Sequence, residues 1–449
     1  MNFIDLFSGC GGLSLGLLNA GLNGLFAIEK NADAFATLKK NLIDNTPYNE
    51  KIFKWDSSIL PISSHDIKEI ISNDIYLKYL KELSERKLVD IIVGGPPCQG
   101  FSLAGKRNPQ DPRNKLADAY LRVVEIIRPN FILMENVKGI SLKFDKKGTE
   151  ISTAEKIKST LRDLGYIAIS FLENSMSWGV PQSRTRFILL GIKKELFTNL
   201  EDIKEIEDKL LTLVLNDIGE FSTLFKKKKN LPPTVSTEDA ISDLKTFIAS
   251  EIRKDTIIAT DAPGVRFKQL KYSVHNSSLT DYQKLMRGKL KNSTYIAGGL
   301  RLANHSLPVQ HRFKKILNDI NSEEKSKKYN ISSGVNLPKK YITEQLSTRK
   351  HTLFVLNKMK VSATITTLPD DLLHYDEPRI LTVRECARLQ SFPDWYEFTG
   401  PYTTGGERRK LSCPKYTQVG NAVPPLMAEG IGSFISIRLP ELIKILNYT

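Results

Sequence analysis

Cysteine and histidine are scarce in this chain of 449 residues. It has four cysteines and six histidines, and no two cysteines form a Cys-x-x-Cys pair. Structural zinc sites and disulfide frameworks both need clustered cysteines, so neither is expected here. We therefore predict a protein that binds no metal. The four cysteines are Cys10, Cys98, Cys386 and Cys413.

The chain also lacks long apolar runs, and its acidic residues are fewer than its basic ones. The chain has no run of about 20 apolar residues, which argues against a transmembrane helix, and it lacks the pattern of a signal peptide. We expect a soluble, cytoplasmic protein with no membrane partner. Lysine and arginine total 65 against 50 aspartates and glutamates, a formal net charge of +15. This excess favours a polyanionic partner, and nucleic acid more than an anionic membrane.

A glycine-rich turn near the N-terminus predicts a nucleotide-type cofactor site. Residues 2–7 are typical of a strand, residues 8–12 of a glycine turn and residues 13–21 of a helix. The Gly-x-Gly-Gly spacing departs from the dinucleotide fingerprint Gly-x-Gly-x-x-Gly. A second strand, residues 24–28, ends in Glu29, and a carboxylate there can accept both hydroxyls of a ribose. The pattern favours a nucleoside cofactor.

A Gly-Pro loop after another apolar strand carries a single cysteine. The strand, residues 89–93, runs into Gly94-Gly95-Pro96-Pro97-Cys98. Glycines allow a sharp turn, and prolines fix φ near about −65°, so the loop would hold the Cys98 thiol in one place, as a nucleophile requires. The alternative is a packed structural thiol, because free cysteine is often buried.

One further apolar strand ends in an acid, and two arginines precede another strand. The apolar strand that begins at Phe131 ends in Glu135, which either caps a helix or faces a cleft. Ligands bind at the carboxyl ends of parallel strands, so Glu135 and Cys98 are expected to face the same cleft. Arg184 and Arg186 precede a strand at residues 187–191. Their alternate spacing predicts that they point to one face.

Six short blocks resemble the cytosine-5 DNA methyltransferase family and stand in the family's order. One such block means little, whereas six in order are hard to obtain by chance. The resemblance implies an α/β fold with a Rossmann-like, S-adenosylmethionine-dependent methyltransferase domain, whose mostly parallel mixed sheet has helices on both faces. It also implies a smaller, variable DNA-recognition domain. The blocks are Asp5 to Gly12, Pro97 to Gln99, Glu135 to Val137, Gln182 to Arg186, Arg379 to Pro393 and Gln418 to Pro425.

The resemblance implies transfer of a methyl group from S-adenosylmethionine to carbon 5 of a cytosine flipped out of double-stranded DNA. Cys98 would add to carbon 6 as a thiolate. Glu135 would contact N3 of the base, since a carboxyl group in a dry pocket can stay protonated near neutral pH. Arg186 or Arg184 would stabilise the charge on O2 with a planar guanidinium. In the family, the second arginine of the motif contacts the base more directly.

The resemblance also implies which residues bind the cofactor. Phe7 would pack on the adenine or ribose, Glu29 would hold the ribose hydroxyls and Asp56 would accept the adenine amino group. Lys30 stands where the family commonly has an aromatic residue. The other cofactor-binding candidates are Gly9, Gly11, Gly12, Pro96, Pro97, Leu116, Asn421 and Val423.

Contacts to DNA are expected in two regions. The loop at residues 101–114 follows the nucleophile and suits a lid that closes over DNA, and by resemblance Gln99 would brace the gap left by the flipped base. The loop-rich middle of the chain holds basic residues, most of which would touch only phosphates. The candidate DNA-binding residues are Gln99, Ser102, Lys106, Arg107, Arg266 and Arg301.

The blocks divide the chain into three parts. Residues 1–194 would form the catalytic and cofactor-binding domain, residues 195–395 the target-recognition domain, and residues 396–449 a segment that returns to the catalytic domain. DNA would lie in a cleft between the domains. We expect a nucleoid-associated monomer that modifies DNA beside a cognate restriction endonuclease.

Two alternatives share the same scaffold. A transfer-RNA cytosine methyltransferase has similar Pro-Cys and Glu-Asn-Val blocks, but such enzymes generally have a smaller variable region than this chain. A non-catalytic DNA-binding homologue is disfavoured by the intact Cys98, Glu135, Arg184 and Arg186. The target DNA sequence and any preference for hemimethylated DNA do not follow from the blocks.

Overall fold

A computed structural model describes most of the chain, which divides into two compact units. The first unit comprises Met1–Trp178, Thr185–Phe225 and Val423–Thr449, and the second comprises Gly179–Arg184 and Lys226–Ala422. The described residues are 1–44, 49–97, 115–142, 151–198, 202–245, 258–262, 265–268, 279–288, 297–303, 305–346, 348, 353–402 and 412–448.

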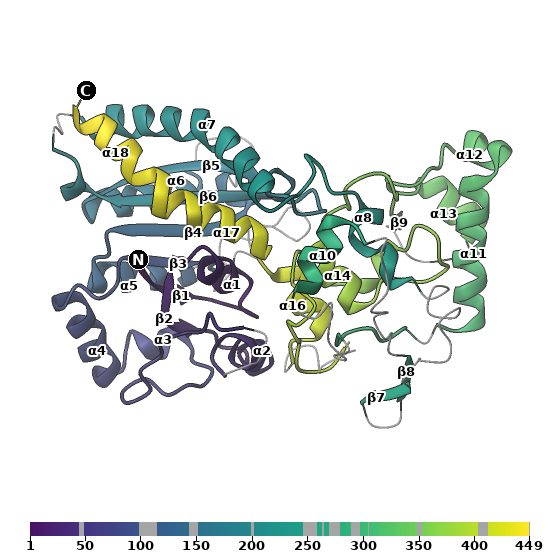
Figure 1. Cartoon of the computed structure of the whole chain (residues 1–449), viewed down its shortest axis with the longest axis horizontal. Coiled ribbons are helices and arrows are strands. Elements are labelled where there is room, and N and C mark those ends of the chain that lie inside the picture. The colour runs from purple at the N-terminus through teal and green to yellow at the C-terminus, as the bar shows by residue number, and fades with distance from the viewer. Residues whose placement is uncertain are drawn as a thin grey trace. The chain divides into compact units, whose positions relative to one another are not determined.

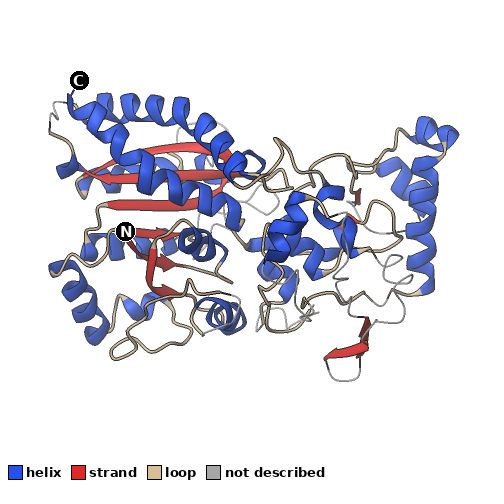
Figure 2. Cartoon of the chain, viewed as in Figure 1, coloured by secondary structure: helices blue, strands red, loops and turns tan. Residues whose placement is uncertain are grey.

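The first unit is built on a mixed sheet, shown in red in Figure 2. Its strand order in the described residues is β2-β1-β3-β4-β6-β5. The first four of these are parallel to one another, whereas β6 is antiparallel to both β4 and β5. The strands are β1 (Asn2–Leu6), β2 (Asn23–Ile28), β3 (Ile91–Gly94), β4 (Phe131–Val137), β5 (Tyr166–Asn174) and β6 (Thr185–Lys193).

The central strands are apolar along almost their whole length. All four residues of β3 are buried, as are four of the five residues of β1, because helices cover both faces of a parallel sheet. The helices of the first unit are α1 (Gly12–Asn19), α2 (Ala32–Leu42), α3 (Ile67–Ile70), α4 (Asp74–Glu85), α5 (Lys115–Ile127), α6 (Thr153–Asp163), α7 (Ile203–Lys228, to Phe225), α17 (Pro425–Ser433) and α18 (Leu439–Tyr448).

Helices α17 and α18 belong to the first unit, and Figure 1 shows them in yellow near the teal α7. Helix α17 packs on α1, where an added Cβ on Gly16 would lie 2.3 Å from Cβ of Ala428. A π-helical turn, η9 (Phe434–Arg438), joins α17 to α18. From Val423 onward the chain therefore belongs to the first unit through close packing between helices far apart in the sequence, whereas residues 396–422 of the predicted returning segment belong to the second unit.

The second unit is mainly helical, with short strands. An apolar core that includes Phe313, Ile316 and Tyr341 packs α11 against α13. The helices are α8 (Thr237–Ile241), α10 (Asp281–Arg287), α11 (Leu307–Asn321), α12 (Glu323–Tyr329), α13 (Lys339–Leu346), α14 (Val383–Leu389) and α16 (Lys415–Asn421). The strands are β7 (Ile258–Ala262), β8 (Val265–Lys268), β9 (Phe354–Val355) and β10 (Leu372–Leu373).

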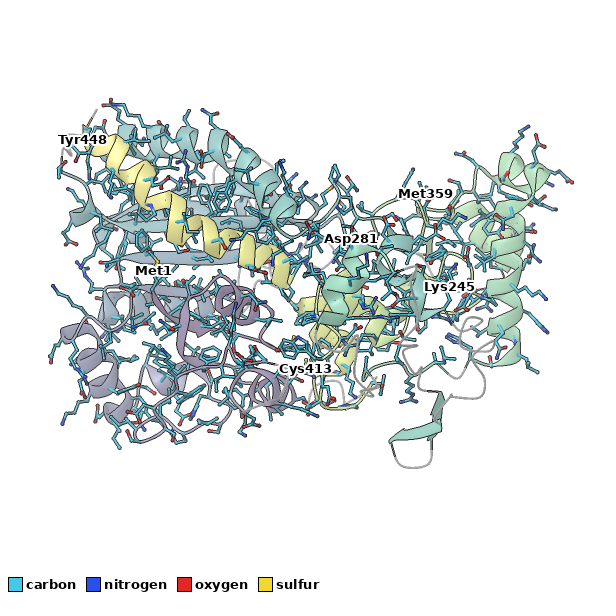
Figure 3. All side chains as sticks on the ribbon, viewed as in Figure 1. Met1, Lys245, Asp281, Met359, Cys413 and Tyr448 are labelled. Atoms are coloured by element: carbon cyan, nitrogen blue, oxygen red, sulfur yellow. The ribbon has the colours of Figure 1, made fainter. Side chains whose placement is uncertain are left out.

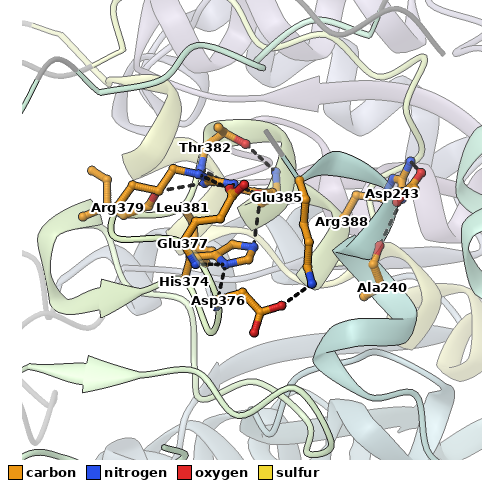
Figure 4. Close-up of polar contacts among 12 residues, drawn as sticks. Ala240, Asp243, His374, Asp376, Glu377, Arg379, Leu381, Thr382, Glu385 and Arg388 are labelled. Carbon is orange, nitrogen blue, oxygen red and sulfur yellow. Dashed lines mark hydrogen bonds and ion pairs between the residues drawn. The ribbon is translucent and has the colours of Figure 1, made fainter. Parts of the chain in front are cut away.

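Buried ion pairs link the Arg379 to Pro393 block to the rest of the second unit (Figure 4). Arg379 donates to both oxygens of Glu385, at 2.7 and 2.8 Å, and also pairs with Glu377. Arg388 donates to Asp243 and to Asp394, at 2.6 Å to each oxygen of the latter. Buried charges need such partners, so the basic residues of this block are structural.

The unit boundaries differ from the domains drawn from the sequence. Most of α7 belongs to the first unit, whereas the sequence division placed everything from residue 195 to residue 395 in the recognition domain. The second unit also extends to Ala422 and takes up the short segment Gly179–Arg184. The motif that ends in Arg186 is therefore shared between the two units.

Candidate active site

The turn after β1 begins one residue earlier than the sequence predicts, because β1 ends at Leu6 and Phe7, expected in the strand, belongs to the turn. Phe7, Gly9 and Gly11 all have positive φ, at 62°, 56° and 87°, a region that non-glycine residues rarely adopt. Ser8 N–H donates to the Ile28 carbonyl at 3.1 Å, which joins the turn to the end of β2. The strained Phe7 marks a turn held in place by its surroundings.

Glu29 contacts this turn through a hydrogen bond to its backbone. Its carboxylate accepts hydrogen bonds from Gly9 N–H at 2.9 Å and Asn31 N–H at 2.7 Å. Burial raises the pKa of Glu29, and the backbone donors oppose that rise. A carboxylate has room for further donors beyond these two. The predicted ribose-binding acid thus lies against the glycine turn.

A buried acid in β1 is a polar group that sequence reasoning passed over. Asp5 is fully buried, and Ser14 Oγ on α1 donates to its Oδ2. Burial, and secondarily the charge of Glu29, raises the pKa of Asp5 to about 7. Asp5 Oδ1 and the neighbouring Ser8 Oγ have no hydrogen-bond partner among the described residues. An acid in the middle of an otherwise apolar strand was the available signal.

The adenine side of the predicted cofactor site is more open. Asp56 is exposed, accepts from Ser58 N–H at 3.0 Å and has a lowered pKa because of that bond. Its segment runs beside β2, since Lys54 N–H donates to the Gly24 carbonyl at 2.8 Å. Lys30 pairs with Asp66 at 2.8 Å. This ion pair therefore stands where an aromatic residue was expected.

The start of the Gly-Pro loop lies against the end of β4. Asn136 Nδ2 donates to the Pro96 carbonyl at 3.1 Å, and an added Cβ on Gly95 would lie 3.2 Å from Glu135 Oε2. Pro96 is buried, Pro97 is exposed, and Leu116 at the start of α5 packs against the sheet core. The predicted Cys98, Gln99, Ser102, Lys106 and Arg107 lie outside the described residues.

Glu135 and Arg186 form an ion pair at this edge of the sheet. Arg186 Nε lies 2.9 Å from Glu135 Oε1, and both side chains are largely buried, at 12% and 13% exposed. Because β6 is antiparallel to β4, its first residues lie beside the last residues of β4, and Arg186 pairs in register with Val137. Two candidates that are 51 positions apart in the sequence therefore meet.

Arg184 has a different environment. It is only 3% exposed, and its guanidinium donates to the carbonyls of Ile365 at 3.2 Å and Gly420 at 2.9 Å. These contacts lie within the second unit, to which Asn421 also belongs, whereas Val423 begins the last segment of the first unit. The structure therefore pairs Arg186 with Glu135, whereas these two hydrogen bonds of the Arg184 guanidinium lie within the second unit.

The two arginines predicted to contact DNA from the middle of the chain both belong to the second unit. Arg266 lies in β8. Arg301 is partly exposed and stacks on the ring of Tyr402, with 4.9 Å from Cζ to the ring centroid. Among the described residues there is no cluster of acids, histidines and cysteines placed to hold a metal ion. No helix in the described ranges is long and apolar enough to span a membrane.

The mixed, mostly parallel sheet, the glycine turn and the acid after β2 are typical of the class of Rossmann-like methyltransferase folds. A prophage-encoded protein of E. coli, described as a putative DNA modification methyltransferase, has a similar solved structure, with a TM-score of 0.61, 24% identity, and coverage of 97% of this chain and 98% of the other. That likeness supports the fold. The observed fold agrees with the mostly parallel sheet and flanking helices that the sequence predicts.

Sequence comparison identifies the family. The profile of the family described as C-5 cytosine-specific DNA methylase matches residues 1–436. The type II methyltransferase M.DdeI of Desulfomicrobium norvegicum is 31% identical over 97% of this chain and 88% of its own length. M.AgeI of Thalassovita gelatinovora is 27% identical, covering 98% and 100%. The chain belongs to the C-5 cytosine-specific DNA methylase family, and it is a DNA (cytosine-5)-methyltransferase, as the six blocks predicted.

Proposed function

We propose that the chain transfers the methyl group of S-adenosylmethionine to carbon 5 of a cytosine flipped out of double-stranded DNA, through a covalent Cys98 adduct. The observation that carries this proposal is the Glu135–Arg186 pair beside the anchored Pro96. An acid and a fixed cation stand together where the loop leads directly into Cys98. Such a pair can serve N3 and O2 of one pyrimidine ring.

The residues around the glycine turn fit S-adenosylmethionine. Glu29 lies under the turn and suits the ribose hydroxyls, while Asp5 Oδ1 and Ser8 Oγ are buried polar atoms with no partner among the described residues. Buried polar groups need hydrogen bonds, which the polar amino-acid portion of this cofactor offers. When bound, the cofactor supplies an electrophilic methyl group. Phe7, Gly9, Gly11, Gly12, Asp56, Pro96, Pro97, Leu116, Asn421 and Val423 are proposed to complete its site.

The chain's own residues would carry the proton and charge transfers. The Cys98 thiolate bonds to carbon 6 as the carbon 5–carbon 6 double bond opens. Glu135, which takes up a proton when the base binds, gives that proton to N3. Arg186 donates to O2 while negative charge builds there, and carbon 5 becomes nucleophilic. After methylation a base removes the carbon 5 proton, and the carbon 5–carbon 6 double bond re-forms as the sulfur–carbon 6 bond breaks. N3 returns its proton to Glu135, and the Cys98 thiolate leaves. Arg184 would position the segment before β6 through its two carbonyl contacts.

DNA recognition is proposed for the second unit together with the loop after Cys98. The contacting residues would be Gln99, Ser102, Lys106, Arg107, Arg266 and Arg301. We further propose that the enzyme acts as a monomer, beside a cognate restriction endonuclease whose site it protects. DNA methylated by the purified enzyme should resist that nuclease, whereas cleavage of fully methylated DNA would contradict the pairing.

The deciding experiment maps methylation on unmethylated genomic DNA. Purified protein and S-adenosylmethionine should produce 5-methylcytosine at one short recurring sequence, read by bisulfite sequencing. Target DNA with 5-fluorocytosine should form a denaturation-resistant adduct that is absent from the Cys98→Ala variant, because fluorine blocks the elimination step. Methylation without any adduct would contradict the covalent route. No methylation of DNA together with methylation of transfer RNA would replace the DNA substrate by RNA.

A further inference from the structure

Two buried glutamines link places where the chain passes from the second unit to the first. The chain makes this passage after Arg184 and again after Ala422, which we call the two crossings. Gln182 and Gln390 are both fully buried, and Gln182 Nε2 donates to Gln390 Oε1 at 2.8 Å. Gln390 Nε2 donates in turn to the carbonyls of Val419 at 2.7 Å and Ala422 at 3.5 Å. This amide pair therefore connects the two crossings within the second unit.

The segment before the first crossing is also held by its backbone. Gln182 pairs with Ser362 in a parallel bridge. Ser362 N–H donates to the Pro181 carbonyl at 3.0 Å, and Ser183 N–H donates to the Ser362 carbonyl at 2.9 Å. Gln182 Oε1 accepts from Ile365 N–H at 2.8 Å. The segment therefore resembles an added strand of the second unit, with its buried side-chain amide bonded at both oxygen and nitrogen.

Close packing fixes the second crossing against the same partner segment. Gly420, in α16, lies two residues before Ala422, and an added Cβ on Gly420 would lie 2.3 Å from the carbonyl oxygen of Thr366. Arg184 donates to the carbonyls of both Ile365 and Gly420. Even a methyl group would not fit at this contact. The two crossings are therefore held at one spacing by both side-chain and backbone contacts.

The chain beyond the crossings leads into the candidate active site. Arg186 follows Arg184 by two residues and pairs with Glu135. Helix α17, which packs on α1, begins three residues after Ala422. So few residues leave the backbone little slack, and the place of the Arg186 guanidinium depends on how firmly the crossings are held. A donor stabilises developing charge well only if it is fixed before the reaction.

We propose that Gln182 and Gln390 are positioning residues for Arg186. This inference rests on the proposed function and deepens it, because it makes the second unit, which is proposed to bind DNA, responsible for aligning the guanidinium with the base. Neither glutamine touches substrate in this proposal. Because both amides act through Arg186, their loss should slow the chemical step more than it weakens the binding of DNA or cofactor.

The test combines steady-state kinetics with a double-variant cycle. Gln182→Met and Gln390→Met keep the side-chain length but remove the amide, and each should lower kcat about 10- to 100-fold through misalignment. The KM values for DNA and S-adenosylmethionine should change by less than about twofold. In an Arg186→Lys background, where the fixed guanidinium is already missing, the same substitutions should lower kcat by less than about threefold. Single-turnover methylation with radiolabelled S-adenosylmethionine measures the slow variants.

Gln283→Met is the matched control. Gln283 is another buried glutamine of the second unit, and its Nε2 donates to Ser242 Oγ at 2.8 Å. It lies in α10, whose first residue, Asp281, is labelled in Figure 3. This variant should lose stability as the two test variants do, but keep the wild-type kcat. Where a methionine variant does not fold, Gln182→Asn and Gln390→Asn, which keep an amide with a shorter reach, give the same test in a milder form.

Distinct results separate the possible failures. If the losses in kcat add fully to that of Arg186→Lys, or equal the unfolded fraction seen by thermal unfolding, the glutamines only support folding. That result would overturn the inference and leave the proposed function standing. A raised KM for DNA with wild-type kcat would assign the glutamines to DNA binding and would also overturn it. If the wild-type protein methylates no DNA, the proposed function fails and the inference fails with it.

Discussion

At the scale of single residues, two arginines two positions apart have opposite environments. Arg186 lies in β6 and pairs with Glu135, whereas Arg184 precedes the strand and donates to backbone carbonyls. Period-two alternation holds only within a strand, and β6 begins at Thr185. The spacing alone could not show that the two guanidinium groups have different partners.

Substituting each arginine by lysine should separate their roles. We expect Arg186→Lys to lower kcat by about 100-fold or more with little change in the melting temperature, because lysine keeps the charge but loses the planar guanidinium that is fixed at the base. Arg184→Lys should lower unfolding stability by about 1–3 kcal/mol, because buried carbonyls lose their donors. Kinetics and thermal unfolding measure both effects. A catalytically dead Arg184→Lys variant of wild-type stability would assign the base contact to Arg184.

The buried Asp5 predicts a pH dependence of stability. Its pKa is raised from 3.8 to about 7, so between these values the folded protein holds a proton that the unfolded chain has released. The stability contributed by this group therefore falls as pH rises through that window and is level above about pH 7. At about 1.4 kcal/mol per unit of pKa, the full change is about 4 kcal/mol.

The Asp5→Asn substitution removes this titration while keeping an acceptor for Ser14. We expect the stability of Asp5→Asn relative to wild type to increase between pH 4 and about pH 7, then to stay constant. Urea unfolding at several pH values measures the difference. A difference that does not vary with pH would show that the Asp5 carboxyl ionises at its ordinary value.

At the scale of elements, the direction of β6 assembles the site. The first four strands place their carboxyl ends at one edge, and the antiparallel β6 places its first residues at that same edge. The motif at the start of β6 can therefore lie beside the motif at the end of β4. The C-terminal helix α17 contributes by packing on α1, directly after the glycine turn.

Close packing of α17 gives a test at this scale. A Cβ added to Gly430 would lie 1.9 Å from Cε3 of the fully buried Trp178. We expect Gly430→Ala to lower unfolding stability by about 1–3 kcal/mol through overpacking. The matched control is Gly219→Ala in α7, where the new methyl group meets nothing within 4 Å. That control should gain about 0.5–1 kcal/mol from helix propensity, and an equal loss in both variants would contradict the packing argument.

At the scale of the whole molecule, charge and connectivity act together. A net charge of +15 favours encounter with a polyanion over long range. The first unit takes its segments from both ends and the middle of the chain, so it cannot be complete until the C-terminal helices are made. The second unit consists of the short segment Gly179–Arg184 and the long continuous stretch Lys226–Ala422, and segments of the first unit precede and follow each of them in the sequence.

The sequence by itself determined the family, the order of the blocks and the kinds of group in the site. Glycines with positive φ, an acid after β2 and Glu135 at the end of β4 were all predictable, because each depends on neighbouring residues. The buried Asp5, with its raised pKa, was signalled only by one acid among apolar neighbours.

Tertiary structure alone decided which of these groups meet. The Glu135–Arg186 pair depends on the register of β4 and β6, the choice between two arginines depends on where β6 begins, and the Gln182–Gln390 amide pair joins residues 208 positions apart. The unit boundaries likewise follow from the packing of α7 and α17. Local sequence sets backbone conformation and charge, whereas contacts between distant segments arise only when burial of apolar surface brings those segments together.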